Sequence, residues 1–245
     1  FRSHCLCTHD HSGHSRNCTA RNRIGACLFL ILPGELVVLI GDTGVGKTAI
    51  MQNLCLQTDL PILYLSLEVH QNLLFRRFIQ IAHGMTKEDV HQYYQNNENK
   101  LSNAISHIKV VTTPPDFDSI EKIIKDTNAK IVVVDVVDGI NTPGIVDETA
   151  KTAYLGNGLK VLAQTKDIII FAVHHISKQS AVAGRLGVHS GKGSSSIEQK
   201  ADKVLVVEGL REMPNRTIRS EKARDENQFK VTGMLNPKTF IFTPN

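Results

Sequence analysis

The stretch that decides the fold lies at residues 41–48 and reads Gly41-Asp42-Thr43-Gly44-Val45-Gly46-Lys47-Thr48. It fits the pattern G-x-x-x-x-G-K-[ST] at every position. The strand-like run VVLI precedes it and a helical pattern follows it, which is the context that this pattern requires. A glycine-rich turn can arise by chance, but the full pattern in this context predicts a loop that holds the phosphates of a nucleotide.

The chemistry of this loop follows from its residue types. Glycine lets the backbone approach phosphate oxygens closely, and successive N–H groups then point inward at the anion. The helix that begins here adds the positive end of its dipole. We expect Lys47 to reach the β and γ phosphates and the Thr48 hydroxyl to ligate Mg²⁺.

Apolar runs of strand length alternate with amphipathic helical stretches from residue 33 onward. The runs VVLI, ILYLSL, IVVVD and IIIFAV are continuous, which is typical of strands buried on both faces of a parallel sheet. The expected strands of this part are 36–40, 62–67, 108–112, 131–135 and 168–174. The expected helices are 47–58, 70–83, 88–107, 119–127 and 147–165. This order predicts an α/β doubly wound core, a mainly parallel sheet flanked by helices.

The pattern changes after Gly187, where short strands are joined by turn residues such as Met213-Pro214-Asn215. The expected strands of this part are 204–208, 217–223, 229–235 and 239–242. We interpret them as antiparallel strands added at the C-terminal edge of the sheet. The sequence contains no internal repeat.

Two acidic residues end buried strands. Asp135 closes IVVVD and brings a carboxylate to the carboxyl edge of the sheet, where it would hold Mg²⁺ through water. Asp138 is its competitor, but it falls beyond the end of the strand. Glu68 ends ILYLSLE and would orient the attacking water. The alternative for Glu68 is an acid that stabilises the N-terminus of helix 70–83.

Several segments together resemble the RecA-like ATPase domain of DnaB-type hexameric replicative helicases, including phage primase-helicases and their mitochondrial relatives. The matching segments are PGELVVLIGDTGVGKT, YLSLEV, VVVD, LKVLAQTKDIIIFAVHHISK, GSSSIEQKADKVLVVE and SEKARDENQFKV. Many NTPases share the phosphate loop, whereas YLSLE, SSSIEQKAD and the later K-x-R are more specific. The match spans residues 33–242, and it implies a RecA-like P-loop NTPase that hydrolyses ATP with Mg²⁺.

The resemblance implies catalytic roles for two residues. Glu68 matches the family's catalytic glutamate after the second core strand. His175 matches a polar Gln or His that senses the γ-phosphate, while its neighbour His174 is interpreted as structural. The alternative for His175 is a buried histidine satisfied by the backbone.

The resemblance also implies a site shared between subunits. Lys222 and Arg224 match a Lys-x-Arg pair that reaches into the neighbouring subunit's nucleotide. Arg224 would be the arginine finger and Lys222 a second phosphate contact. The alternative is a solvated basic stretch, since Arg216 and Arg219 belong to the same run.

Residues 177–196 match the loops that face the central channel and contact DNA in this family. The stretch SKQSAVAGRLGVHSGKGSSS lacks acids and takes its positive charge mainly from Lys178, Arg185 and Lys192. Because it contains no aromatic residue, we expect it to hold single-stranded DNA through phosphates, with strong salt dependence. The alternative is a flexible lid over ATP. The other channel-loop position, 138–148, is acidic and matches poorly.

The resemblance implies a homo-oligomer, either a hexameric ring or a helical filament. Its expected partners are single-stranded DNA and primase or other replication proteins. The N-terminal primase or primase-binding domain of the family, and the helical linker that docks on the next subunit, are not recognisable in this sequence. Because ring stability depends on that linker, the resemblance does not extend to processive unwinding by this chain alone.

The first 32 residues form a zone of different composition ahead of the ATPase domain assigned to 33–245. Its candidate metal ligands are His4, Cys5, Cys7, His9, His11, His14, Cys18 and Cys27. The C-x-C spacing has no matching second half, so we interpret this zone as a tail or irregular segment rather than a structural zinc site.

The bulk composition, 41% hydrophobic and 21% charged residues, is typical of a soluble globular protein. No apolar run approaches the roughly 20 residues of a membrane span. A net charge of +4 permits a nucleic-acid partner without requiring one. Five cysteines, four of them in the first 27 residues, favour a reducing compartment, the cytoplasm or an organelle matrix. No signal peptide is recognisable, and a first residue other than Met suggests a fragment or processed form.

Three functions remain open on the sequence. The leading hypothesis is an ATP-dependent DNA helicase or translocase motor that hydrolyses ATP at subunit interfaces and acts on single-stranded DNA. The second is a RecA-, KaiC- or RadA-like oligomeric ATPase with a regulatory, recombination or loading role and no unwinding activity. The third is a nucleotide-binding scaffold without catalysis.

Overall fold

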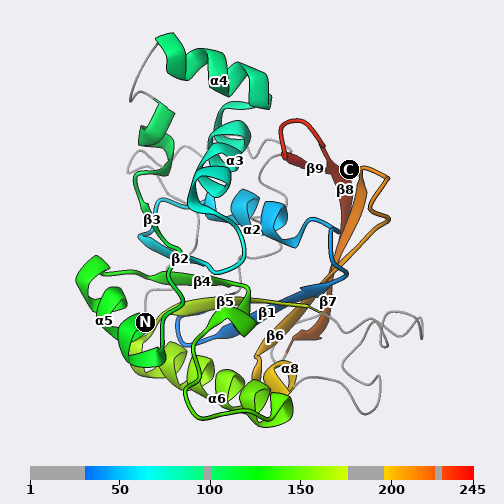
Figure 1. The fold of residues 1–245 in the computed structure, drawn as a ribbon. Helices are drawn as coiled ribbons and strands as arrows, with labels where there is room; N and C mark the ends of the chain where they lie inside the picture. Colours follow the sequence, from blue (N-terminus) through cyan, green and yellow to red (C-terminus); the bar gives the residue numbers. More distant parts are fainter. Residues whose placement is uncertain (1–30, 97–100, 176–195, 224–227) are drawn as a thin grey trace, which may run out of the picture.

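One mixed sheet runs through the molecule (Figure 1). The computed structural model describes residues 31–96, 101–175, 196–223 and 228–245, and within these ranges the sheet has nine strands in the order β3-β2-β4-β5-β1-β6-β7-β8-β9. The first six are parallel: β1 Leu36–Gly41, β2 Ile62–Ser66, β3 Ile108–Val111, β4 Ile131–Asp135, β5 Ile169–His175 and β6 Lys203–Glu208. The last three are antiparallel: β7 Asn215–Ala223, β8 Lys230–Leu235 and β9 Phe242–Pro244. The predicted fold class is confirmed.

Helices cover both faces of the sheet (Figure 1). One face carries α2 Lys47–Cys55 and α3 Gln71–His83, and α4 Lys87–Asn96 packs on α3. The other face carries α5 Phe117–Thr127, α6 Glu148–Lys166 and α8 Ser196–Lys200. Across the described part of the chain, no helix has the length and apolar character needed to cross a membrane.

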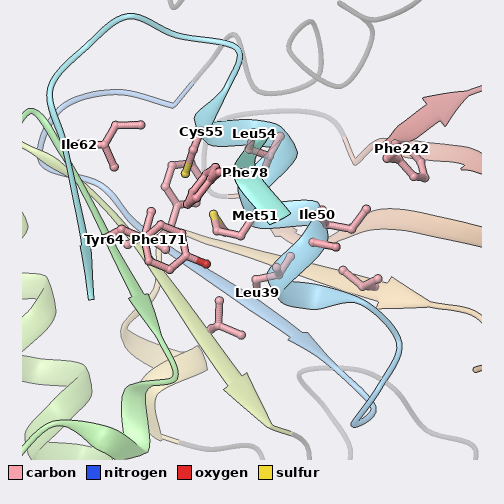
Figure 2. Close-up of a cluster of buried hydrophobic side chains, with 14 of the residues drawn as sticks. Leu39, Ile50, Met51, Leu54, Cys55, Ile62, Tyr64, Phe78, Phe171 and Phe242 are labelled. Atoms are coloured by element: carbon pink, nitrogen blue, oxygen red, sulfur yellow. The ribbon is translucent and has the colours of Figure 1, made fainter. Parts of the chain in front are cut away.

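Alternate residues of each central strand enter different halves of the core. In β1, Val37 and Leu39 pack on the α2 side, while Val38 and Ile40 pack on the α6 side. Figure 2 shows the α2 half, where Leu39 lies with Met51, Tyr64 and Phe171 among side chains from helices and strands. Because both faces are buried, the strands need apolar residues at every position, which accounts for the continuous runs.

Two expected elements were wrong. The single helix at 88–107 is instead α4, ending at Asn96, followed by a 3₁₀ turn at Leu101–Ile105. The four residues NENK between them include two asparagines, whose side chains compete for backbone hydrogen bonds and disfavour a helix. The strand expected at 239–242 begins only at Phe242.

A tight turn explains the later start of that last strand. The Asn236 side chain accepts hydrogen bonds from the backbone N–H of Lys238 and Thr239, at 2.9 and 3.2 Å. Phe240 has a φ of 58°. An Asn that bonds to the backbone ahead of it is a turn former, so residues 236–240 cannot extend as a strand.

Candidate nucleotide-binding and catalytic site

The phosphate loop connects β1 to α2 and requires glycine at its end. Gly46 has a φ of 98°, and a Cβ there would lie 2.6 Å from Leu235 Cδ2. Gly44 also has a positive φ, at 83°. Side chains other than hydrogen would strain both positions, so the glycines of the motif serve the close turn that starts the helix.

Lys47 occupies the centre of the loop and is buried. Its Nζ donates hydrogen bonds to the carbonyl oxygens of Gly41 and Asp42, at 2.7 and 2.9 Å. Burial lowers the pKa of Lys47, while the nearby carboxylates of Asp135 and Glu68 act in the opposite direction. The Lys47 ammonium group is therefore held inside the loop, in a position to bind the phosphates of a nucleotide.

Asp135 is the last residue of β4 and is fully buried. Alternation along the strand places it on the α2 face together with Ile131 and Val133. The Tyr64 hydroxyl donates to Asp135 Oδ2 at 2.8 Å, whereas Oδ1 has no hydrogen-bond partner among the described residues. Burial raises the pKa of Asp135, and the hydroxyls of Tyr64 and Thr48 oppose that rise.

Glu68 follows β2 and His175 ends β5, the two strands on either side of β4, and their side chains meet at the carboxyl end of β4. His175 Nε2 lies 3.2 Å from Glu68 Oε2, and the two residues are 107 positions apart in the chain. The cap of helix α3 is His70, whose ring nitrogen accepts from the backbone N–H of Asn72. Glu68 is therefore not the capping residue, and its carboxylate faces the site.

Five of the eight phosphate-loop residues line one cavity of about 550 Å³ together with residues at the carboxyl ends of the neighbouring strands. The predicted site residues that line it are Thr43, Gly44, Gly46, Lys47, Thr48, Glu68, Asp135 and His175. A buried carboxylate oxygen without a partner, beside a threonine hydroxyl, suits a hard cation such as Mg²⁺ that prefers oxygen ligands. Thr48 and Asp135 would hold that cation, which would supply positive charge next to the nucleotide's phosphates.

The neighbouring pair at this edge is His174 with Asp138. His174 Nδ1 lies 3.7 Å from Asp138 Oδ2, and the His174 side chain is largely buried. Burial lowers the pKa of His174, and the Asp138 carboxylate acts against that shift. Asp138 thus pairs with a histidine beside the site, whereas Asp135 lines the cavity and Asp138 does not.

The basic run at the C-terminal edge is not a solvated stretch where the structure describes it. Arg216 is buried, and its guanidinium donates to the carbonyl oxygens of Val45, Leu210, Met213 and Asn215. Arg219 pairs with Glu208 and Glu221. Lys222 Nζ donates to the carbonyl oxygens of Glu198, Gln199 and Ala201 at the end of α8.

Three cavity or loop contacts were missed by the sequence reasoning. Arg77 of α3 lines the cavity, with its guanidinium carbon 5.0 Å from the centre of the Phe240 ring. Arg216 fixes the phosphate loop through Val45, at 2.6 Å from Nε to the carbonyl oxygen. Tyr64 holds Asp135. Arg77 could have been found from the sequence, because it is a charged residue within the apolar stripe of α3. Tyr64 could not, because a tyrosine in an apolar strand is typical of a buried core residue.

Several predicted residues lie outside the described ranges. They are Lys178, Arg185 and Lys192 of the channel loop, Arg224, and the Cys/His residues of the first 30 positions. Within the described ranges, no group of three His, Cys, Asp or Glu side chains is arranged to hold a metal ion.

Comparison with known proteins identifies the family and a set of relatives. The model of a family described as an AAA domain matches residues 25–181, more than half of the chain. DNA repair protein RadA of Listeria monocytogenes serovar 1/2a is 27% identical over 200 residues, and RadA of a Synechocystis species is 27% identical over 203. Each match covers 79% of this chain, which spans 37% of the length of each RadA.

Solved structures resemble the whole described fold. One ATPase domain of known structure matches with a TM-score of 0.75 at 17% identity, over 87% of this chain and 85% of that chain. The structure of a DnaB-like replicative helicase, described together with its interactions with primase, matches with a TM-score of 0.73 at 17% identity. The match covers 86% of this chain and 57% of the helicase chain. These likenesses confirm the fold that the motifs predicted, which is that of RecA-like ATPase domains.

Proposed function

The chain belongs to the AAA domain family, and on that premise we propose that it is an oligomeric, Mg²⁺-dependent ATPase that couples hydrolysis to movement on single-stranded DNA. The observation that carries the proposal is the convergence of Lys47, Asp135 and Glu68 on one cavity at the carboxyl ends of parallel strands. In open α/β sheets this edge is where ligands bind.

Each residue has a role that its surroundings support. Residues 41–48 bind the phosphates, with Lys47 as the cation that meets the β and γ groups. Thr48 and Asp135 hold Mg²⁺, Asp135 through water. Glu68 accepts a proton from the attacking water, and His175 keeps that carboxylate in place at 3.2 Å and meets the γ-phosphate.

A neighbouring copy would complete the site. Arg224 is assigned as an arginine finger in trans and Lys222 as a second phosphate contact, in a hexameric ring or helical filament. Lys222 already binds carbonyl oxygens at the end of α8, so reaching another nucleotide requires it to leave them. Hydrolysis would then depend on assembly, because the finger stabilises charge only where two subunits meet.

The rest of the proposal concerns DNA and the whole protein. Lys178, Arg185 and Lys192 would contact the phosphates of single-stranded DNA. Residues 33–245 would be the motor domain and 1–32 an appended segment, in the cytoplasm or an organelle matrix. Primase or other replication proteins are proposed partners of the full-length protein, by analogy with the solved DnaB-like helicase and its interactions with primase.

The test is the ATPase rate with and without single-stranded DNA. We expect DNA to stimulate the rate, and we expect Lys192→Ala to lose that stimulation while keeping the DNA-free rate. Lys125→Ala is the matched control, since it removes a lysine from the exposed side of α5. A rate that single-stranded DNA leaves unchanged in an assembled sample would contradict the proposal.

A second function is favoured by the curated relatives. The two RadA proteins are 27% identical to this chain, and they are DNA repair proteins. A RadA-like ATPase with a recombination, regulatory or loading role would hydrolyse ATP without separating strands. An assay on a duplex with a single-stranded tail distinguishes the two, because only the helicase proposal predicts ATP-dependent release of the shorter strand.

A further inference from the structure

The hydroxyl of one tyrosine, Tyr64, lies deep in the core beneath the site. Tyr64 is the third residue of β2 and has no exposed surface. In the register of β2 with β4, Tyr64 is opposite Val133, and Asp135 is two residues further along the same face. A long aromatic side chain spans this diagonal distance. The Tyr64 hydroxyl therefore reaches the carboxylate that ends the neighbouring strand.

The tyrosine ring has little freedom to move. Phe78 packs its ring edge against Tyr64, with ring centres 5.6 Å apart and an angle of 87° between the planes. Figure 2 shows Tyr64 in one cluster of buried side chains with Phe78, Phe171 and Met51. The Tyr64 hydroxyl lies 2.8 Å from a carboxylate oxygen of Asp135, so the phenol is the donor of this hydrogen bond. Because the Tyr64 ring is held in place, its hydroxyl also sets the orientation of the Asp135 carboxylate.

The two oxygens of Asp135 are consequently different. Oδ2 accepts the Tyr64 hydrogen bond at 2.8 Å, and Oδ1 has no partner among the described residues. Asp135 lines the cavity together with Thr48. A buried carboxylate oxygen is costly to leave without a partner, which marks Oδ1 as the oxygen reserved for a ligand.

We propose that Tyr64 is a positioning residue for the metal site, holding Asp135 Oδ2 so that Oδ1 alone is presented to the cation or to its coordinating water. The inference rests on the proposed function, because it takes Mg²⁺ as the cation held by Thr48 and Asp135. Groups that hydrogen-bond to metal ligands set the ligands' orientation, and their loss commonly weakens metal binding by about 10–100-fold.

The experiment measures Mn²⁺ binding to the ADP complex by the electron paramagnetic resonance signal of free Mn²⁺. Tyr64→Phe removes only the hydroxyl and keeps the packed ring. We expect its Mn²⁺ dissociation constant to rise about tenfold. ADP affinity without metal should stay unchanged, which also shows that the variant is folded.

Two controls make the outcome decisive. Tyr94→Phe removes another inward-facing hydroxyl, one without a hydrogen-bond partner in the described structure, and should leave Mn²⁺ affinity unchanged. Asp135→Asn should weaken Mn²⁺ binding more than Tyr64→Phe does. If only Asp135→Asn weakens binding, the role of Tyr64 is wrong and the metal site stands. If neither variant weakens it, the proposed metal site is wrong as well.

Discussion

Glu68 and His175 form a contact across the carboxyl edge of the sheet, with 3.2 Å between Oε2 and Nε2. Glu68 follows β2, and His175 is the last residue of β5. These strands flank β4, which ends in Asp135. The contact holds a half-exposed carboxylate beside the phosphate loop. A carboxylate in this position is suited to accept a proton from water during hydrolysis.

Replacing the carboxylate tests that role. Glu68→Gln keeps a polar group that can still bond to His175 but removes the base. We expect steady-state phosphate release to fall by about 10²–10⁴-fold while ATP binding is retained. Asp138→Asn, at the same edge of the sheet but paired with His174, should keep most of the activity. Unchanged turnover in Glu68→Gln would favour the scaffold hypothesis.

The stability of the domain should respond to acid through His174. Burial lowers the pKa of His174 in the folded chain, so below its usual value of about 6.5 the unfolded chain binds the proton more readily. The free energy of unfolding that comes from keeping His174 neutral is fully present above about pH 6.5. It is lost as the pH falls toward the lowered pKa of His174 in the folded chain. The facing groups are Asp138, His175 and Lys47.

Urea unfolding of His174→Gln checks this expectation. The variant should lose less unfolding free energy than the parent chain between about pH 7.5 and pH 5, because it has no buried imidazole to protonate. Parallel pH profiles for the two proteins would show that His174 does not carry the acid sensitivity.

Arg216 should be important for the stability of the phosphate loop. Arg216→Met removes the donor to four backbone carbonyls, including that of Val45, and leaves them buried without it. We expect the free energy of unfolding to fall by about 2–4 kcal/mol and ADP affinity to fall with it. Arg211→Met, at a neighbouring exposed arginine, should change the unfolding free energy by less than about 0.5 kcal/mol. Equal stabilities for the two variants would contradict this role.

A mixing experiment tests the shared site. Arg224→Ala and Lys47→Ala proteins should each be nearly inactive alone, since one lacks the finger and the other the phosphate-binding cation. Mixed assemblies should regain part of the ATPase rate, because some interfaces then combine an intact loop with an intact finger. The measurement needs mixed assembly confirmed by mass. Absence of recovery in confirmed mixed assemblies would rule out a finger in trans.

The sequence alone determined the phosphate loop, the parallel core and the acid that ends β4. These features are local: 41–48 is a contiguous pattern, and a strand buried on both faces is apolar at every position. Local patterns failed for the helix expected at 88–107. Its middle is rich in asparagine, which disfavours a helix, and a 3₁₀ turn follows.

Only the tertiary structure decided which polar groups meet. Tyr64 reaches Asp135 across 71 positions, Glu68 meets His175 across 107, and Arg216 reaches Val45 across 171. Spacing along a chain does not encode these pairs, because the order of strands in the sheet sets the neighbours. Once the strands are buried, each polar group must find a partner within reach, and the fold alone fixes which partner that is.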